Sequence, residues 1–180
     1  KSTLITAVSA ARPKVADYPF TTLYPNLGVV RIDVERSFVI ADIPGLIEGA
    51  AEGTGLGIQF LKHLQRTRLL LHLVDLAPLA LDVDPVAQVR QLEEELLKFD
   101  ADLADKARWL VFTKADLMPP EQARQKAEEA VAELDWKAPW FLISSVTKSG
   151  IDELMQQVSA ELERIEDEEA GAAARETSEQ

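Results

Sequence analysis

Apolar residues along this chain fall into short continuous runs that alternate with longer segments of helical spacing. Three continuous runs predict buried parallel strands: Leu69–Val74, Trp109–Phe112 and Trp140–Ile143. Two further runs, Val29–Val34 and Phe38–Ala41, predict a hairpin. Helical spacing predicts helices over Thr3–Ala11, Ile58–Thr67, Val86–Phe99, Glu121–Leu134 and Ile151–Ile165. Because strands alternate with helices, the expected fold class is an α/β sheet with flanking helices.

The segments between these elements are rich in proline, glycine or charge. Residues 12–28 contain three prolines and are expected to be irregular, and residues 42–57 contain five of the eight glycines and are expected to form a loop. Residues 163–180 carry seven acidic and two basic residues with few apolar groups. We therefore expect a domain over residues 1–162 and a disordered acidic tail over residues 163–180.

Composition narrows the possible functions. The 180 residues suit one domain, and 31 acidic against 19 basic residues give a net charge of −12, which argues against broad binding to nucleic-acid phosphates. The absence of cysteine excludes disulfides and thiolate metal sites, and two histidines make a polyhistidine metal site implausible. No apolar run approaches the roughly 20 residues of a membrane helix, so we expect no membrane partner and a cytoplasmic location. The start at Lys1 rather than Met suggests a piece of a longer chain.

Polar clusters follow the predicted strands, where ligands of open α/β sheets bind. The first is Asp42-Ile43-Pro44-Gly45. An aspartate at a strand end can hold magnesium, usually through water, and a glycine three residues later lets a backbone N–H approach a terminal phosphate. The alternative is an ordinary strand-end aspartate followed by a Pro-Gly turn.

The second cluster, Thr113-Lys114-Ala115-Asp116, resembles the guanine-recognition motif Asn-Lys-x-Asp. The Asp116 carboxylate can accept hydrogen bonds from N1–H and the N2 amine of guanine, a donor pair that adenine lacks. The Lys114 stem can pack along the base. Thr113 departs from the common asparagine, so weaker base affinity is expected. A solvated loop with a chance lysine and aspartate is the alternative.

The third cluster, Ser144-Ser145-Val146, resembles the loop that closes over guanine O6, although serine after a strand is also common turn chemistry.

Lys1-Ser2-Thr3 resembles the end of a phosphate-binding loop, in which the lysine reaches the β and γ phosphates and the serine hydroxyl binds magnesium. Thr22, about 20 residues later, can coordinate magnesium only when a γ-phosphate is present, which would make a switch.

Taken in order, these clusters match the GTPase pattern, and the sequence from about residue 1 to 160 resembles the Obg family of GTPases. Its most specific stretches are Tyr18–Val30, Asp42–Ala50 and Gly55–Leu61. The resemblance implies a P-loop NTPase fold of the Ras-like GTPase type, with the first strand missing from this chain, and magnesium held by Ser2, Thr22 and Asp42. The implied GTP/GDP site comprises Lys1, Ser2, Thr3, Phe20, Thr21, Thr22, Leu23, Tyr24, Asp42, Ile43, Pro44, Gly45, Thr113, Lys114, Ala115, Asp116, Ser144, Ser145 and Val146.

The resemblance also implies slow GTP hydrolysis by a monomer that associates with the large ribosomal subunit and acts in its assembly and in the stringent response. Leu46 stands where many GTPases carry a glutamine that orients the attacking water, so hydrolysis should be slow or need help, and no catalytic residue is identified. Because the missing strand is central in this fold, we expect these residues alone to fold poorly and to bind GTP weakly.

Three other functions stay open. One is a ribosome-binding module gated by GTP, in which hydrolysis is incidental. Another is an ATPase, which Asp116 opposes because its carboxylate suits guanine. The last is a pseudo-GTPase without nucleotide.

Overall fold

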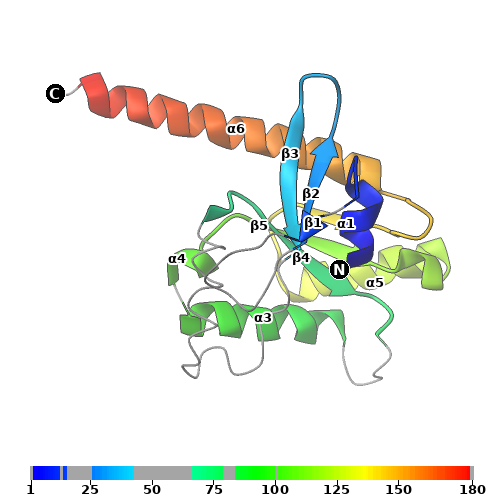
Figure 1. Ribbon diagram of the computed structural model, residues 1–180. Helices are drawn as coiled ribbons and strands as arrows, with labels where there is room; N and C mark the ends of the chain where they lie inside the picture. The colour runs from blue at the N-terminus through cyan, green and yellow to red at the C-terminus, as the bar shows by residue number, and fades with distance from the viewer. Residues whose placement is uncertain are drawn as a thin grey trace.

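The computed structural model describes residues 2–12, 14–15, 26–42, 66–78, 84–99 and 101–178, shown as ribbons in Figure 1. The helices are α1 (Ser2–Val8), α3 (Pro85–Phe99), α4 (Ala101–Ala104), α5 (Pro120–Glu133) and α6 (Ile151–Ser178), with a 3₁₀ helix, η2, over Ala115–Leu117. The strands are β1 (Lys14–Val15), β2 (Asn26–Arg31), β3 (Ser37–Asp42), β4 (Leu70–Asp75), β5 (Arg108–Thr113) and β6 (Trp140–Leu142).

The sheet β4-β5-β6 is parallel, as the apolar runs predict. Val74 pairs in register with Phe112, which pairs in turn with Leu142. Each strand lies within one residue of its predicted bounds. The connections between these strands run through α3 and α5 on one face of the sheet, and α1 and α6 cover the other face. Because the strands are buried on both faces, their sequences are apolar without alternation.

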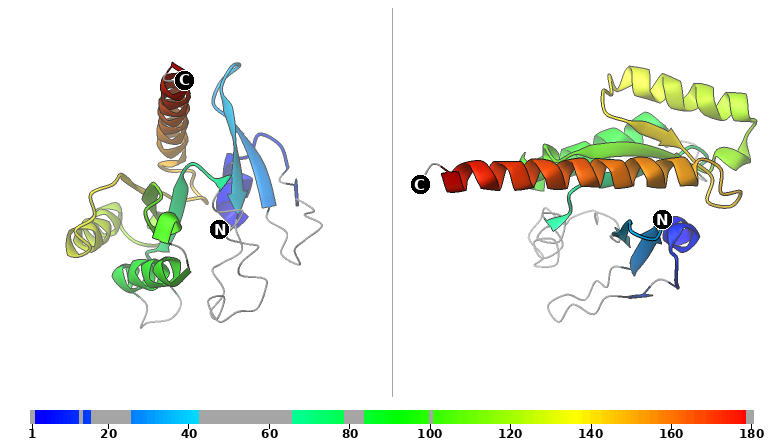
Figure 2. Two further views of the ribbon diagram at one scale, coloured as in Figure 1. Left: turned by 90° about the vertical axis from the view of Figure 1, so that its left-hand side faces the viewer. Right: turned by 90° about the horizontal axis from the view of Figure 1, so that it is seen from above.

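Alternate side chains of β5 point to opposite faces of this sheet and divide the core into two clusters. Trp109 and Val111 pack with buried residues of α6 and α1. Leu110 and Phe112 pack instead with buried residues of α3 and α5. The result is a helix–sheet–helix arrangement, and Figure 2 shows α6 apart from α3 and α5.

The second sheet, β1-β2-β3, is antiparallel, and it confirms the predicted hairpin. The Asp33 carboxylate closes the turn by accepting hydrogen bonds from the backbone N–H groups of Glu35 (2.9 Å) and Arg36 (2.8 Å). The Arg36 side chain and these bonds lower the pKa of Asp33 below its ordinary value. Because Asp33 belongs to the turn, β2 ends at Arg31 and not at the predicted residue 34. Residues 12–28 are expected from the sequence to be irregular, but β1 and the first residues of β2 lie within this range.

The two sheets share a core without sharing a ladder. Val30 of β2 and Leu4 of α1 belong to the cluster that contains Trp109 and Val111 of β5. Within the described ranges, however, β3 and β4 are each the last strand of their sheet on one side. The expectation that the first strand of the fold is missing stays a prediction.

Helix α6 continues to Ser178, so the prediction of a disordered tail is wrong for residues 163–178. Glutamate, alanine and arginine, which dominate this stretch, are strong helix formers. Arg68, which precedes β4, also donates to Glu166 (Nη1 to Oε1, 2.5 Å) and Glu169 (Nη2 to Oε2, 3.1 Å) on α6. The acidic composition of this stretch indicated disorder, because composition alone does not reveal that Arg68 lies close enough to pair with Glu166 and Glu169.

Gly150 is expected to tolerate no side chain. Its φ of +73° is one that L-residues rarely adopt, and an added Cβ would lie 2.4 Å from the Leu142 carbonyl oxygen, which belongs to β6 and has little room to shift. We expect Gly150→Ala to lower the free energy of unfolding by about 2 kcal/mol in urea denaturation. A loss below about 0.5 kcal/mol would contradict this backbone geometry.

Substitutions at Gly171 test whether the distal part of α6 is helical. A Cβ there would meet no atom within 4 Å, so Gly171→Ala removes the flexibility of glycine without a clash. We expect amide hydrogen exchange over residues 166–175 to slow by about two- to fivefold, whereas Gly171→Pro should abolish protection there. Exchange at random-coil rates in all three proteins would show a disordered tail.

Candidate functional site

Three polar residues lie at the carboxyl edge of the parallel sheet. Asp75 ends β4, Thr113 ends β5 and is its register partner, and Ser144 follows β6. The Thr113 hydroxyl donates to the Val74 carbonyl oxygen at 3.3 Å, which links the ends of β4 and β5. The expected convergence is confirmed for the clusters after β5 and β6, because Ser144 donates to Asp116, whereas Asp42 ends a strand of the other sheet.

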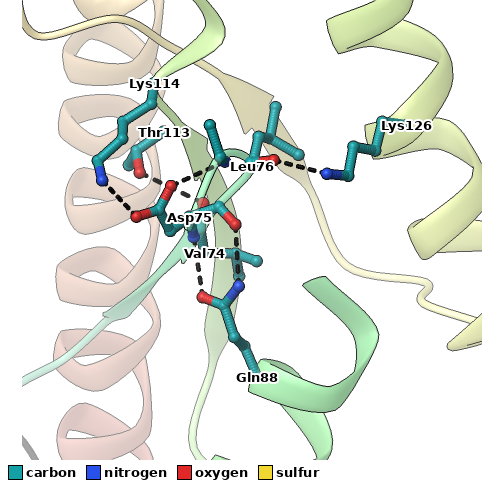
Figure 3. Close-up of polar contacts among 8 residues, drawn as sticks. Val74, Asp75, Leu76, Gln88, Thr113, Lys114 and Lys126 are labelled. Atoms are coloured by element: carbon teal, nitrogen blue, oxygen red, sulfur yellow. Dashed lines mark hydrogen bonds and ion pairs between the residues drawn. The ribbon is translucent and has the colours of Figure 1, made fainter. Parts of the chain in front are cut away.

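Lys114 turns the chain sharply where β5 ends. Its φ of 64° and ψ of 32° place it in the left-handed region, uncommon for a residue with a side chain, and it is the N-cap of η2. Its ammonium donates to Asp75 Oδ2 at 2.5 Å, and Figure 3 shows this contact. The other Asp75 oxygen, Oδ1, accepts a hydrogen bond from the Ala77 backbone N–H at 2.9 Å. Asp75 thus connects the turn after β4 with the loop after β5.

Asp116, in η2, is exposed but held by a buried serine. Ser144 is 1% exposed, and its hydroxyl donates to Asp116 Oδ1 at 2.6 Å and accepts from the Thr147 backbone N–H at 3.1 Å. The Ala115 N–H also donates to the Ile143 carbonyl oxygen at 3.2 Å. These contacts orient the Asp116 carboxylate, whose second oxygen has no hydrogen-bond partner within the part of the chain that the structure describes.

The carboxyl end of β4 is fixed by two helices (Figure 3). The Gln88 side chain of α3 accepts from the Asp75 backbone N–H and donates to the Asp75 carbonyl oxygen, both at 2.9 Å. The Lys126 ammonium of α5 donates to the Leu76 carbonyl oxygen at 2.7 Å. A side chain that satisfies both backbone groups of one half-buried residue leaves that residue little freedom.

An open depression of about 500 Å³ lies between α1 and the loop after β6, lined by Thr3, Thr6, Ala7, Ser145 and Lys148. It brings together predicted residues from the two ends of the sequence.

The other predicted residues are placed less fully. Asp42 is half-buried at the end of β3, Ala115 is half-buried in η2, and Val146 is exposed. Ser2 begins α1, and its side chain is not among those described. Nine predicted residues lie outside the described residues: Lys1, Phe20, Thr21, Thr22, Leu23, Tyr24, Ile43, Pro44 and Gly45.

Of the three predicted magnesium ligands, only Asp42 has a side chain among those that the structure describes. Among the side chains that the structure describes, no cluster of three His, Cys, Asp or Glu could hold a metal. A lone carboxylate at a strand end fits magnesium when phosphate and water oxygens complete the coordination, which is the usual arrangement for this ion in nucleotide sites.

The sequence reasoning missed Asp75, Gln88 and Lys148. Asp75 directly follows an apolar run, as Asp42 does, so the same rule could have identified it. Gln88 and Lys148 carry no such signal, because their roles depend on how α3 and the loop after β6 pack.

The chain matches the sequence model of a family described as 50S ribosome-binding GTPase over residues 1–114. The match includes Lys1-Ser2-Thr3, Asp42 and Lys114 and ends before Asp116 and Ser144.

Among the helices of the described residues, none combines the length and the apolar composition that a membrane span requires.

Solved structures with the same fold include the following three. The apo cytosolic domain of the T. maritima FeoB iron transporter matches with 21% identity and a TM-score of 0.62, covering 89% of this chain and 58% of that one. A variant of Aquifex aeolicus Era bound to GDP·AlF4⁻ matches with 20% identity and a TM-score of 0.61, covering 88% and 52%. A putative nucleolar GTP-binding protein 1 from Plasmodium falciparum matches with 15% identity and a TM-score of 0.59, covering 98% and 86%.

These likenesses confirm the predicted fold class, a P-loop GTPase domain with a mixed sheet and flanking helices. The chain spans little more than half the length of the FeoB and Era chains.

Ser144 should contribute to stability through its two hydrogen bonds. Ser144→Ala leaves the Thr147 N–H without its acceptor and frees the Asp116 carboxylate, so we expect a loss of about 1–2 kcal/mol of unfolding free energy in urea denaturation. The matched control is Ser149→Ala, at an exposed position of the same loop, and should change stability by less than about 0.5 kcal/mol. Equal effects of the two substitutions would contradict this role.

Proposed function

Because the chain belongs to the family of 50S ribosome-binding GTPases, we propose that it is a GTP-binding molecular switch whose base-recognition site is built on Asp116. The observation that supports this most directly is the 2.6 Å hydrogen bond from buried Ser144, which orients the exposed Asp116 carboxylate beside Lys114. The family as a whole implies GTP hydrolysis.

The chemistry of Asp116 favours guanine. A carboxylate offers several acceptor positions, and Ser144 occupies one of them. The remaining positions suit the N1–H and N2 amine of guanine, whereas adenine presents no such donor pair. Ser145, which lines the open depression with Thr3, would close over the base from the loop after β6.

The phosphates and magnesium belong to the opposite part of the proposed site. Lys1 would contact the β and γ phosphates, while Ser2, Thr22 and Asp42 would hold magnesium. The bound ion would neutralise charge that develops on the phosphates during hydrolysis. Phe20–Tyr24 would line the nucleotide, with Ile43, Pro44 and Gly45 near the terminal phosphate.

Slow hydrolysis is proposed because Leu46 cannot orient water. We further propose the Obg subfamily, a monomeric state, a cytoplasmic location and action on the large ribosomal subunit during its assembly and in the stringent response. The stretches Tyr18–Val30 and Asp42–Ala50 support this narrower assignment.

Leu46 also favours a second candidate function, a module whose GTP state gates docking to the ribosome while turnover is incidental. The discriminating measurement is GTP turnover with and without large ribosomal subunits. Stimulation of GTP turnover by the subunits of more than about tenfold supports the function as an enzyme. Nucleotide-dependent binding without stimulation supports the module.

The proposed base specificity is tested with Asp116→Asn. Wild-type full-length protein should bind labelled GDP in the presence of magnesium and release it to GTP but not to ATP. Asp116→Asn should lose GDP affinity by at least about 30-fold and gain affinity for xanthosine diphosphate, because an amide presents a donor where the carboxylate presents an acceptor. Asp105→Asn, exposed before β5, is the matched control and should bind GDP like wild type. Equal binding of adenine and guanine nucleotides by wild type would overturn the proposal.

A further inference from the structure

We propose that Asp75 is a positioning residue for guanine recognition: its carboxylate holds Lys114 and thereby fixes the loop that presents Asp116. This inference rests on the proposed function and adds to it a residue outside the recognised motifs. Asp75 lies at the end of β4, whereas Lys114 and Asp116 lie after β5.

Both oxygens of the Asp75 carboxylate are occupied by partners with different roles. Oδ1 accepts from the Ala77 backbone N–H at 2.9 Å and forms the turn after β4. Oδ2 accepts from the Lys114 ammonium at 2.5 Å. The Asp75 side chain is 28% exposed and that of Lys114 is 46% exposed, so solvent weakens this ion pair without removing it.

Lys114 needs such a restraint because of its backbone. A residue with a side chain adopts a φ of 64° only where its surroundings enforce it. Lys114 is the N-cap of η2 and has no side-chain capping bond there, so the geometry of Lys114 sets where Asp116, two residues later, is presented. The ion pair fixes the far end of the Lys114 side chain while β5 fixes its backbone.

The frame on the Asp75 side is rigid. Gln88 of α3 binds both backbone groups of Asp75, and Lys126 of α5 binds the next carbonyl oxygen, that of Leu76. Figure 3 shows these contacts converging on one strand end. The carboxylate therefore has a defined position before any nucleotide arrives, which lowers the entropy lost on binding.

Thr113 makes this restraint more important. Its hydroxyl reaches the Val74 carbonyl oxygen at 3.3 Å, which is long for an O–H···O hydrogen bond. The Asp75–Lys114 contact is charge-assisted and much shorter, and is the stronger of the two side-chain links between the ends of β4 and β5.

Asp75→Asn isolates this contact, because the amide oxygen can still accept from Ala77 while the negative charge that holds Lys114 is lost. We expect the Kd for GDP of the full chain to rise by about three- to tenfold. Lys114→Met should raise it at least as much, and the double variant should be no worse than Lys114→Met alone. Asp75→Glu, which restores a carboxylate, should recover part of the affinity. Asp105→Asn is the control.

A second measurement needs no nucleotide. Amide exchange at residues 115–117 should accelerate in Asp75→Asn and in Lys114→Met, while exchange in α5 stays unchanged. If Asp75→Asn fails to fold, Lys114→Met alone gives this readout, and unchanged exchange there overturns the proposal.

The outcomes separate this inference from the proposed function. Wild-type protein that binds no guanine nucleotide overturns both. Wild-type binding with an unchanged Kd in Asp75→Asn, or with fully additive effects in the double variant, overturns the positioning role alone. Tighter GDP binding by Asp75→Asn also overturns it, because the ion pair would then hold Lys114 away from the nucleotide.

Discussion

The parallel pairing of β4, β5 and β6 is the constraint on which the remaining structure depends. Parallel strands point the same way, so their carboxyl ends lie at one edge, and the residues that follow them are brought together whatever their distance in sequence. For this reason Asp75 pairs in register with Thr113, and Ser144 donates to Asp116 in the loop after β5, although 69 positions separate Asp75 from Ser144 in the sequence. The connections run through α3 and α5 on one face of the sheet, while α1 and α6 cover the other face.

Polar groups at that edge bind one another before they bind a ligand. Ser144 is buried, and an unpaired buried hydroxyl is costly, so its bonds to Asp116 and the Thr147 N–H are a condition of folding as well as a means of orienting a carboxylate. The left-handed backbone of Lys114 adds strain at the same place. A preorganised site of this kind lowers the entropy lost on binding, which is consistent with recognition of one base over another.

The ends of the chain are attached by different interactions. α1 and the β2–β3 hairpin join the core through apolar contacts of Leu4 and Val30, without a shared ladder to β4 among the described strands. The distal part of α6 is attached by exposed ion pairs of Arg68 with Glu166 and Glu169, which are individually weak. Local helix propensity and these pairs together account for a helix where composition alone indicated disorder.

The sequence by itself determined the strands and helices of the parallel sheet, because a strand buried on both faces must be apolar throughout and an amphipathic helix must repeat its apolar positions. It also identified Asp116 and Ser144 as candidates for base recognition, because guanine requires a particular set of hydrogen-bond partners. Only the tertiary structure decided which residues support them. Asp75, Gln88 and Lys126 act through contacts between separate elements, and such contacts leave no periodic pattern in the chain. The helix beyond Ile165 is supported in the same way by Arg68, about 100 positions earlier, and no local pattern records that contact.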